Sequence, residues 1–280
     1  MYITDYIEKH GFVYTVELTP PVVFREKFEK KVQKFSKLFK FMNFTDFQRG
    51  TVKVTSLVAA IIAKDYGVEP VIQLTGRDRN RIAIQGELLS AYAMGIENVL
   101  CLTGDHTSLG GDDQAKYVGD VDSVQMLKLV ELLSCGELYG GKKLRKKVEF
   151  CAGAALNHYS EPRELNIFKL HQKERVGARF FQTQPVFDAE EFLKFLEEAK
   201  LKVPVIAGIM PVRNLKMAEF LDKNLSGVKI PEQLMERLSN GEDYLDIFVE
   251  ILRVIKPHIA GVHFMMAKYD EVAYIVDKVG

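Results

Sequence analysis

Short apolar runs alternate with longer segments of helical hydrophobic period along this chain. The clearest case is an apolar run at residues 71–74, a helical pattern at 79–94 that stops at Gly95, and a second apolar run at 99–102. Glycine is common just past the end of a helix. This order predicts two parallel strands joined by a crossover helix, since parallel neighbours need such a connection.

The same alternation extends over the rest of the sequence, and the first predicted element begins at residue 12. Strands are predicted at residues 12–19, 40–45, 71–74, 99–102, 148–155, 179–184, 203–210 and 261–266. Helices are predicted at residues 25–38, 54–66, 79–94, 121–133, 163–176, 189–199, 214–221, 230–238, 244–255 and 270–279.

Eight strands, each followed by a helix at roughly thirty-residue spacing, are typical of a (β/α)₈ barrel. We therefore expect an α/β fold in which residues 1–280 form a single TIM-barrel catalytic domain, with extra helices between strands 7 and 8. The competing architecture is a doubly wound open sheet, which normally carries a glycine-rich nucleotide turn after its first strand. Pro20 and Pro21 stand there instead, so the barrel is favoured.

The amino-acid composition excludes several kinds of function and location. The chain has 38 Lys+Arg and 38 Asp+Glu, so nucleic acid is not expected as a main partner. Cys101, Cys135 and Cys151 are scattered, which gives no metal-binding pattern and suits a reducing compartment. Residues 1–10 alternate charges unlike a signal peptide, and no apolar run reaches the roughly 18 residues of a membrane span. We expect a cytoplasmic protein.

Polar residues stand where the predicted strands end, the edge at which barrels bind ligands. Glu17 lies inside an apolar strand, either as an ion-pair partner or as a partly desolvated acid whose raised pKa lets it deliver a proton. Gln184 ends the sixth strand and either caps a loop or hydrogen-bonds the edge of a heteroaromatic ring. Asp105 follows the fourth strand and either caps the next segment or adjusts the charge around a cofactor.

A second polar group accompanies the fifth strand and its helix. Asn157, Asn166, Lys169 and Lys173 form either a solvated helix face or a phosphate site. Lys169 and Lys173 are four residues apart and therefore share one side of the helix. The charged segment 77–79, Arg-Asp-Arg, is expected to hold loops and helix starts in place, and we leave it outside the catalytic set.

Five segments together resemble the methylenetetrahydrofolate reductase family, in the family's order and from about residue 12 to the C-terminus. The resemblance implies a (β/α)₈ barrel that holds FAD at the carboxyl ends of its strands. It also implies an oxidoreductase of one-carbon metabolism and methionine biosynthesis, in which hydride passes from NADH or NADPH through flavin to 5,10-methylenetetrahydrofolate and gives 5-methyltetrahydrofolate. The segments are Val16-Glu-Leu-Thr-Pro-Pro21, Gln73-Leu-Thr-Gly-Arg-Asp-Arg-Asn-Arg81, Asn98-Val-Leu-Cys-Leu-Thr-Gly-Asp105, Phe180-Phe-Gln-Thr-Gln-Pro-Val-Phe-Asp188 and Gly208-Ile-Met-Pro-Val212.

The resemblance implies roles residue by residue. Glu17 becomes the acid that helps to open the methylene bridge, and Asp105 the carboxylate near the flavin and the pterin. Gln184 and Leu215 take the places of folate contacts. The implied flavin pocket comprises Thr45, Gln73, Leu102, Thr103, Gly104, Asp105, Tyr117, Ala155, Asn157, Tyr159, Asn166, Lys169 and Lys173.

Departures from the family pattern concern mainly the electron donor. Gln73 stands where family members commonly have His, so this side chain can hydrogen-bond flavin but cannot titrate. Gly76 replaces a frequent Cys, and Leu215 replaces an aromatic residue, which weakens the case for stacking on folate or nicotinamide there. The donor is then either NAD(P)H or a partner redox protein, and we expect a homo-oligomer or a complex with such a subunit.

Two alternatives stay open. The chain could be the flavin-binding subunit of a larger redox or methyl-transfer complex without NAD(P)H activity of its own. It could also be a folate-binding methyltransferase barrel that holds no flavin. The absorption spectrum of the purified chain and its oxidation of NADH separate these alternatives from the reductase.

Overall fold

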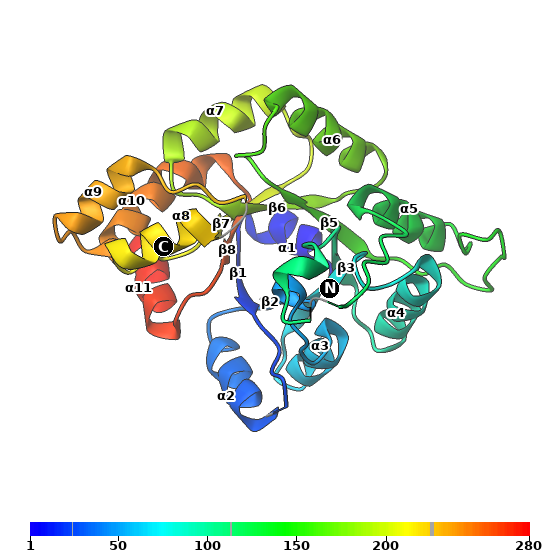
Figure 1. Cartoon of the computed structure of the whole chain (residues 1–280). Helices are drawn as coiled ribbons and strands as arrows, with labels where there is room; N and C mark the ends of the chain where they lie inside the picture. Colours follow the sequence, from blue (N-terminus) through cyan, green and yellow to red (C-terminus); the bar gives the residue numbers. More distant parts are fainter. Residues whose placement is uncertain (24, 113, 225–226) are drawn as a thin grey trace.

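The eight predicted strands are present and close into one parallel barrel in sequence order (Figure 1). The computed structural model describes residues 1–23, 25–112, 114–224 and 227–280. Pairing of β8 with both β7 and β1 completes the ring. The strands are β1 (Val13–Leu18), β2 (Phe41–Phe44), β3 (Glu69–Thr75), β4 (Asn98–Leu102), β5 (Cys151–Leu156), β6 (Phe180–Pro185), β7 (Val205–Ile209) and β8 (Gly261–Phe264).

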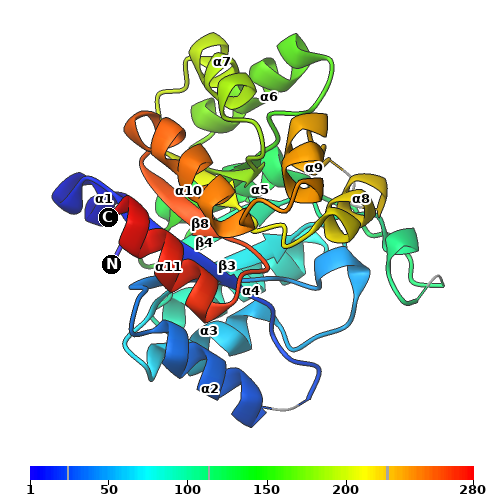
Figure 2. The same cartoon turned by 90° about the vertical axis from the view of Figure 1, so that its left-hand side faces the viewer.

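Helices surround the barrel, as Figures 1 and 2 show from two directions. The extra helices predicted between strands 7 and 8 are confirmed, because α8, α9 and α10 all lie there. In the described ranges, no helix is both long and apolar enough to cross a membrane. The surrounding helices are α2 (Arg25–Phe35), α3 (Ser56–Lys64), α4 (Arg81–Ala93), α5 (Ser123–Ser134), α6 (Arg163–Arg175), α7 (Ala189–Ala199), α8 (Leu215–Asn224), α9 (Glu232–Ser239), α10 (Tyr244–Ile255) and α11 (Tyr269–Val279).

Local hydrogen bonds fix where several elements begin. The side chain of Asn80 accepts hydrogen bonds from the backbone N–H groups of the first turn of α4, so this helix starts at Arg81, two residues later than predicted. Asp122 and Gln125 form a reciprocal capping box at the start of α5. The backbone N–H of Val148 donates to the carbonyl of Leu133, so the pairing of β5 starts only at Cys151.

A helix that the sequence pattern did not predict closes the amino end of the barrel. This helix, α1 (Ile3–His10), places Ile3 and Ile7 against the apolar side chains at the bottom of the barrel interior. The backbone N–H of Ile3 donates to Asn98 Oδ1 at 2.8 Å, which ties α1 to β4. The helix was missed because it has only 8 residues, of which just Ile3 and Ile7 are buried.

The barrel interior changes from apolar to polar along the strands. Successive side chains of a strand point to opposite faces, so alternate residues line the interior. On β1 the alternate residues are Val13, Thr15 and Glu17, of which Val13 packs in the apolar cluster beside α1. The other face of the strand, including Val16 and Leu18, packs in the larger core between barrel and helices. The polar end is therefore the carboxyl end, where barrel enzymes place their sites.

Candidate active site

A cavity of about 360 Å³ lies at the carboxyl ends of the strands, within the size range of small-molecule sites. Its walls come from loops and strand ends that are distant in sequence. They carry carboxylates, amides and cations beside a few apolar side chains. The lining residues are Glu17, Asp46, Gln48, Arg49, Gln73, Thr75, Arg77, Leu100, Cys101, Leu102, Thr103, Gly104, Asp105, Ser123, Ala155, Lys173, Gln182, Thr183, Gln184, His263 and Met265.

Many of the sequence-predicted site residues meet at this cavity. Those in its wall are Glu17, Gln73, Leu102, Thr103, Gly104, Asp105, Ala155, Lys173 and Gln184. Those outside its wall are Thr45, Tyr117, Asn157, Tyr159, Asn166, Lys169 and Leu215. The second set comes mostly from loops and from the outward part of α6, so their ligand contacts stay predictions.

Glu17 is held by donors from three other elements. Gln73 Nε2 donates to Oε2 at 3.0 Å, and Gln48 Nε2 donates to Oε1 at 3.5 Å. His263 Nε2 lies 3.6 Å from Oε2. Burial raises the pKa of Glu17, but His263 and the two amides outweigh burial and leave this pKa below its usual value. The predicted raised pKa is therefore wrong, because it rested on the apolar neighbours in sequence and not on partners from other strands.

The two lysines of α6 have different environments. Lys173 reaches inward, donates from Nζ to the carbonyl of Ala155 at 2.7 Å and lines the cavity. Burial lowers the pKa of Lys173 to about 8, with Asp122 opposing and Lys169 adding to the shift. Lys169 is exposed. Only Lys173 is thus placed at the cavity wall, although the spacing of the two lysines predicted a shared role.

Several of the remaining predicted residues make contacts within the loops around the site. Asn157 Oδ1 accepts from the backbone N–H of Tyr159, and its carbonyl accepts from Asn166 Nδ2. The ring of Tyr117 stacks on His106 with centroids 5.5 Å apart, on the long loop that follows β4. Thr45 is buried, and within the described chain its hydroxyl has no hydrogen-bond partner.

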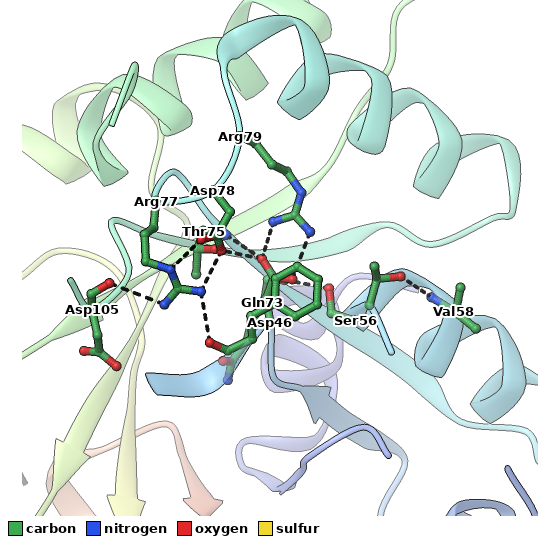
Figure 3. Close-up of polar contacts among 11 residues, drawn as sticks. Asp46, Ser56, Val58, Gln73, Thr75, Arg77, Asp78, Arg79 and Asp105 are labelled. Atoms are coloured by element: carbon green, nitrogen blue, oxygen red, sulfur yellow. Dashed lines mark hydrogen bonds and ion pairs between the residues drawn. The ribbon is translucent and has the colours of Figure 1, made fainter. Parts of the chain in front are cut away.

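Arg77 lies in the cavity wall and joins three loops, and Figure 3 shows its contacts with Asp78 and Asp105. Its side chain is 1% exposed. It donates to the carbonyl of Phe47 at 3.0 Å and to that of Asp105 at 3.3 Å, and it pairs with Asp78 at 2.6 Å. These contacts confirm the prediction that segment 77–79 holds loops in place, and they fix the backbone that carries Asp105.

Asp46 forms a second support beside the first. Its side chain is fully buried, and it pairs with Arg79 at 2.6 Å (Figure 3). Asp46 Oδ2 also accepts from the backbone N–H and the hydroxyl of Thr75 at 3.0 and 2.9 Å. A buried carboxylate needs such partners, because an unpaired one would be costly. Together, Asp46 and Arg79 lock the end of β2 to the end of β3.

His263 and Gln182 are among the wall residues that sequence reasoning missed. His263 stands inside the otherwise apolar strand β8, the same signal that pointed to Glu17, whereas Gln182 begins the polar run Gln-Thr-Gln of β6. Gln182 is 3% exposed, and neither its amide oxygen nor its amide nitrogen has a partner among the residues that the structure describes. Buried amides are normally hydrogen-bonded, so this side chain fits a site that binds a polar ligand.

Fold and cavity define a (β/α)₈-barrel protein with a cavity of small-molecule size at the carboxyl ends of its strands. The family model described as methylenetetrahydrofolate reductase matches residues 2–280, and the chain belongs to this family. Among curated relatives, a probable methylenetetrahydrofolate reductase (NADPH) of Caenorhabditis elegans is 28% identical over 67% of this chain and 27% of its own length. Methylenetetrahydrofolate reductase 2 of Schizosaccharomyces pombe is 24% identical over 94% of this chain and 45% of its own length.

These two relatives are much longer than the segment that matches, since the chain spans less than half of either. A 5,10-methylenetetrahydrofolate reductase of Salmonella typhimurium is 24% identical over 77% of this chain and 71% of its own length. Among solved structures, a Clostridium thermocellum protein described as binding two copies of 5-methyl-5,6,7,8-tetrahydrofolic acid has a TM-score of 0.66 at 14% identity. The match covers 98% of this chain and 96% of that protein. At this identity, the likeness shows the fold.

Proposed function

We propose that this protein reduces 5,10-methylenetetrahydrofolate to 5-methyltetrahydrofolate with FAD as its cofactor and NADH, NADPH or a redox partner protein as electron donor. The main support is the position of Glu17, an enclosed carboxyl group at the end of a barrel strand. It lines a cavity that also carries amide side chains, in a chain of this family. The folate binding described for the Clostridium thermocellum protein of the same fold also supports it.

The residues of the cavity fit a flavin dinucleotide. The unpartnered amide of Gln182 can pair with the pyrimidine edge of a flavin, which offers both donors and acceptors. Lys173 is a cation that can offset a diphosphate. Gly104 has a φ of +89°, and a Cβ there would lie 3.0 Å from the Cβ of Arg77. Gly104 therefore contributes only backbone atoms to the cavity wall. FAD would supply the two-electron redox chemistry of the reaction.

Glu17 would act on the folate itself. The methylene bridge of the substrate is an aminal, and its carbon–nitrogen bond opens once the departing nitrogen is protonated. The electron pair of that bond goes to the protonated nitrogen, while the other nitrogen forms a double bond to the methylene carbon. Gln73 holds the carboxyl group of Glu17 at 3.0 Å and orients it for this transfer.

The lowered pKa of Glu17 sets a condition on this role. In the free site the carboxyl group is ionised at neutral pH, because the donors around it outweigh burial. An acid must hold its proton when the substrate is bound. A bound ring system would exclude water from the 10% of the side chain that remains exposed, and desolvation favours the protonated carboxyl.

The test separates the two halves of the reaction. Replacing Glu17→Gln keeps size and polarity but removes the acid, so flavin reduction by NADH or NADPH should remain nearly intact while reduction of methylenetetrahydrofolate falls at least ~100-fold. The control is Glu271→Gln, because Glu271 is a buried carboxylate outside the cavity that pairs with Arg213 at 2.6 Å. A parallel loss of both half-reactions in Glu17→Gln would show that the acid assignment is wrong.

Measuring both half-reactions also identifies the donor. If NADH and NADPH both fail to reduce bound flavin while reduced flavin still reacts with the folate, the chain is the flavin-binding subunit that draws electrons from a partner. A purified chain without flavin absorbance, and unable to bind added FAD, would favour the methyltransferase alternative instead.

A further inference from the structure

Glu17 has a titratable neighbour on the adjacent strand. His263 lies on β8, which pairs with β1, and its ring is 1% exposed. Its Nε2 atom is 3.6 Å from Glu17 Oε2, and both side chains line the cavity. A proton on either residue is therefore within reach of the other after a small closure of this distance.

The far side of the imidazole ring has partners for both of its protonation states. Nδ1 lies 2.9 Å from Thr15 Oγ1 and 3.3 Å from Asn43 Nδ2. Nδ1–H can donate to this hydroxyl both in the charged ring and in the neutral ring that has given up its Nε2 proton, and the hydroxyl also accepts from the Asn43 amide at 3.3 Å. The ring can therefore pass on its Nε2 proton without leaving Nδ1 unpaired.

Two amides and one lysine also surround the pair formed by Glu17 and His263. Gln73 and Gln48 donate to the Glu17 carboxylate, and these amides do not titrate. Lys31 of α2 is a charged neighbour whose pKa is lowered by desolvation, and the Glu17 charge opposes that shift. Lys31 favours ionised Glu17, so it acts in the same direction as His263.

We propose that Glu17 and His263 hold the proton of the folate step as a pair, with Glu17 as the catalytic residue and His263 as the positioning residue that stores the proton. This inference rests on the proposed reduction of methylenetetrahydrofolate. His263 Nε2 gives its proton to Glu17 and keeps the N–H electron pair. The carboxyl group then protonates the folate nitrogen, whose bond to the methylene carbon breaks as described above.

The pairing has a consequence for pH dependence that a purely structural histidine would not have. A proton that can reside on either of two sites is bound at least as tightly as on one of them alone. The pair therefore keeps its last proton to a higher pH than Glu17 could without the imidazole. Removal of His263 should lower the pH at which the folate step loses activity.

The experiment records the pH profile of the folate half-reaction, with photochemically reduced flavin, in the wild type and in His263→Asn. We expect the pH above which the rate falls to be about one unit lower in the variant than in the wild type. The ratio of the variant rate to the wild-type rate should therefore be about tenfold smaller well above both limbs than at pH 6. A rate that falls by the same factor at every pH would overturn the proposal and leave His263 with a structural role. An unchanged profile would overturn it too.

Two further variants keep the test decisive. Thr15→Val retains the imidazole but removes its hydroxyl partner, and it should move the limb in the same direction by a smaller amount, which serves if His263→Asn folds poorly. In a Glu17→Gln background, His263→Asn should cause no further shift, because the pair is already broken. If the wild type itself fails to react with the folate, the proposed function fails. If the wild type reacts and the variants keep its profile, this inference alone fails.

Discussion

A histidine just after β5 should limit the stability of this protein in mild acid. His158 is 3% exposed, and its ring lies 3.9 Å from that of Tyr159 and 5.0 Å from that of Phe192, measured between centroids. Neither ring nitrogen has a hydrogen-bond partner in the described part of the chain. Burial lowers the pKa of His158 to about 3, and Arg163 adds to the shift. The folded protein therefore holds this ring neutral.

The magnitude follows from the difference in proton binding between the two states. The unfolded chain, with a histidine pKa of about 6.5, binds the proton more tightly than the folded protein does. Stability is therefore lost as the pH falls through about 6.5, and the loss continues down to about pH 3. Between pH 7 and pH 5, this one residue should cost about 2 kcal/mol.

The assay is urea unfolding at both pH values for the wild type, His158→Phe and His158→Leu. Other groups also titrate in this range, so the informative quantity is the difference between variant and wild type. That difference should favour both variants by about 2 kcal/mol more at pH 5 than at pH 7. The two replacements pack differently against Phe192, so their pH-independent parts should differ while the pH-dependent part is shared. A difference that stays constant with pH would refute the argument.

Three further predictions concern the cofactor and the fold. Affinity for FAD, measured by flavin fluorescence, should weaken as the pH rises through about 8, because Lys173 then loses its charge. In Lys173→Met the affinity should be lower, and this pH dependence should be absent. Gly104→Ala should cost about 1–3 kcal/mol in urea unfolding, because the left-handed backbone and close Cβ contacts oppose a side chain there. Gly86→Ala, in open space on α4, should instead stabilise by up to about 1 kcal/mol, and equal effects of the two would contradict the reasoning. Ile3→Ala should cost about 2–5 kcal/mol if α1 closes the barrel, whereas Ile82→Ala, at a side chain 77% exposed, should change stability by less than about 0.5 kcal/mol.

Most of the barrel could be predicted from the sequence, because the period and the length of each apolar segment distinguish strands from helices. Strands buried on both faces appear as apolar runs, and their order with amphipathic helices implies parallel pairing. The prediction missed α1, whose burial depends on the open end of a barrel formed by residues as distant as Phe180 and Ile206. A helix of 8 residues is too short to be stable alone, so these tertiary contacts decide whether it forms.

The candidate site was predictable in position but not in electrostatics. Glu17, Gln184 and Asp105 could be placed because they end or interrupt apolar strands. The sign of the pKa shift at Glu17 depends on Gln73 and on His263, which lies 246 residues away along the chain but only 3.6 Å away in space. No sequence spacing encodes that contact, since it arises when β8 closes the ring against β1.

The central claim is that this cavity carries hydride from a bound flavin to methylenetetrahydrofolate. The most direct measurement reduces the FAD-loaded chain photochemically without oxygen, mixes it with 5,10-methylenetetrahydrofolate, and follows the flavin absorbance while the product is identified. We expect the oxidised flavin spectrum to return as 5-methyltetrahydrofolate forms in equal amount. A flavin that stays reduced in the presence of the folate, or a chain that binds no FAD, would contradict it.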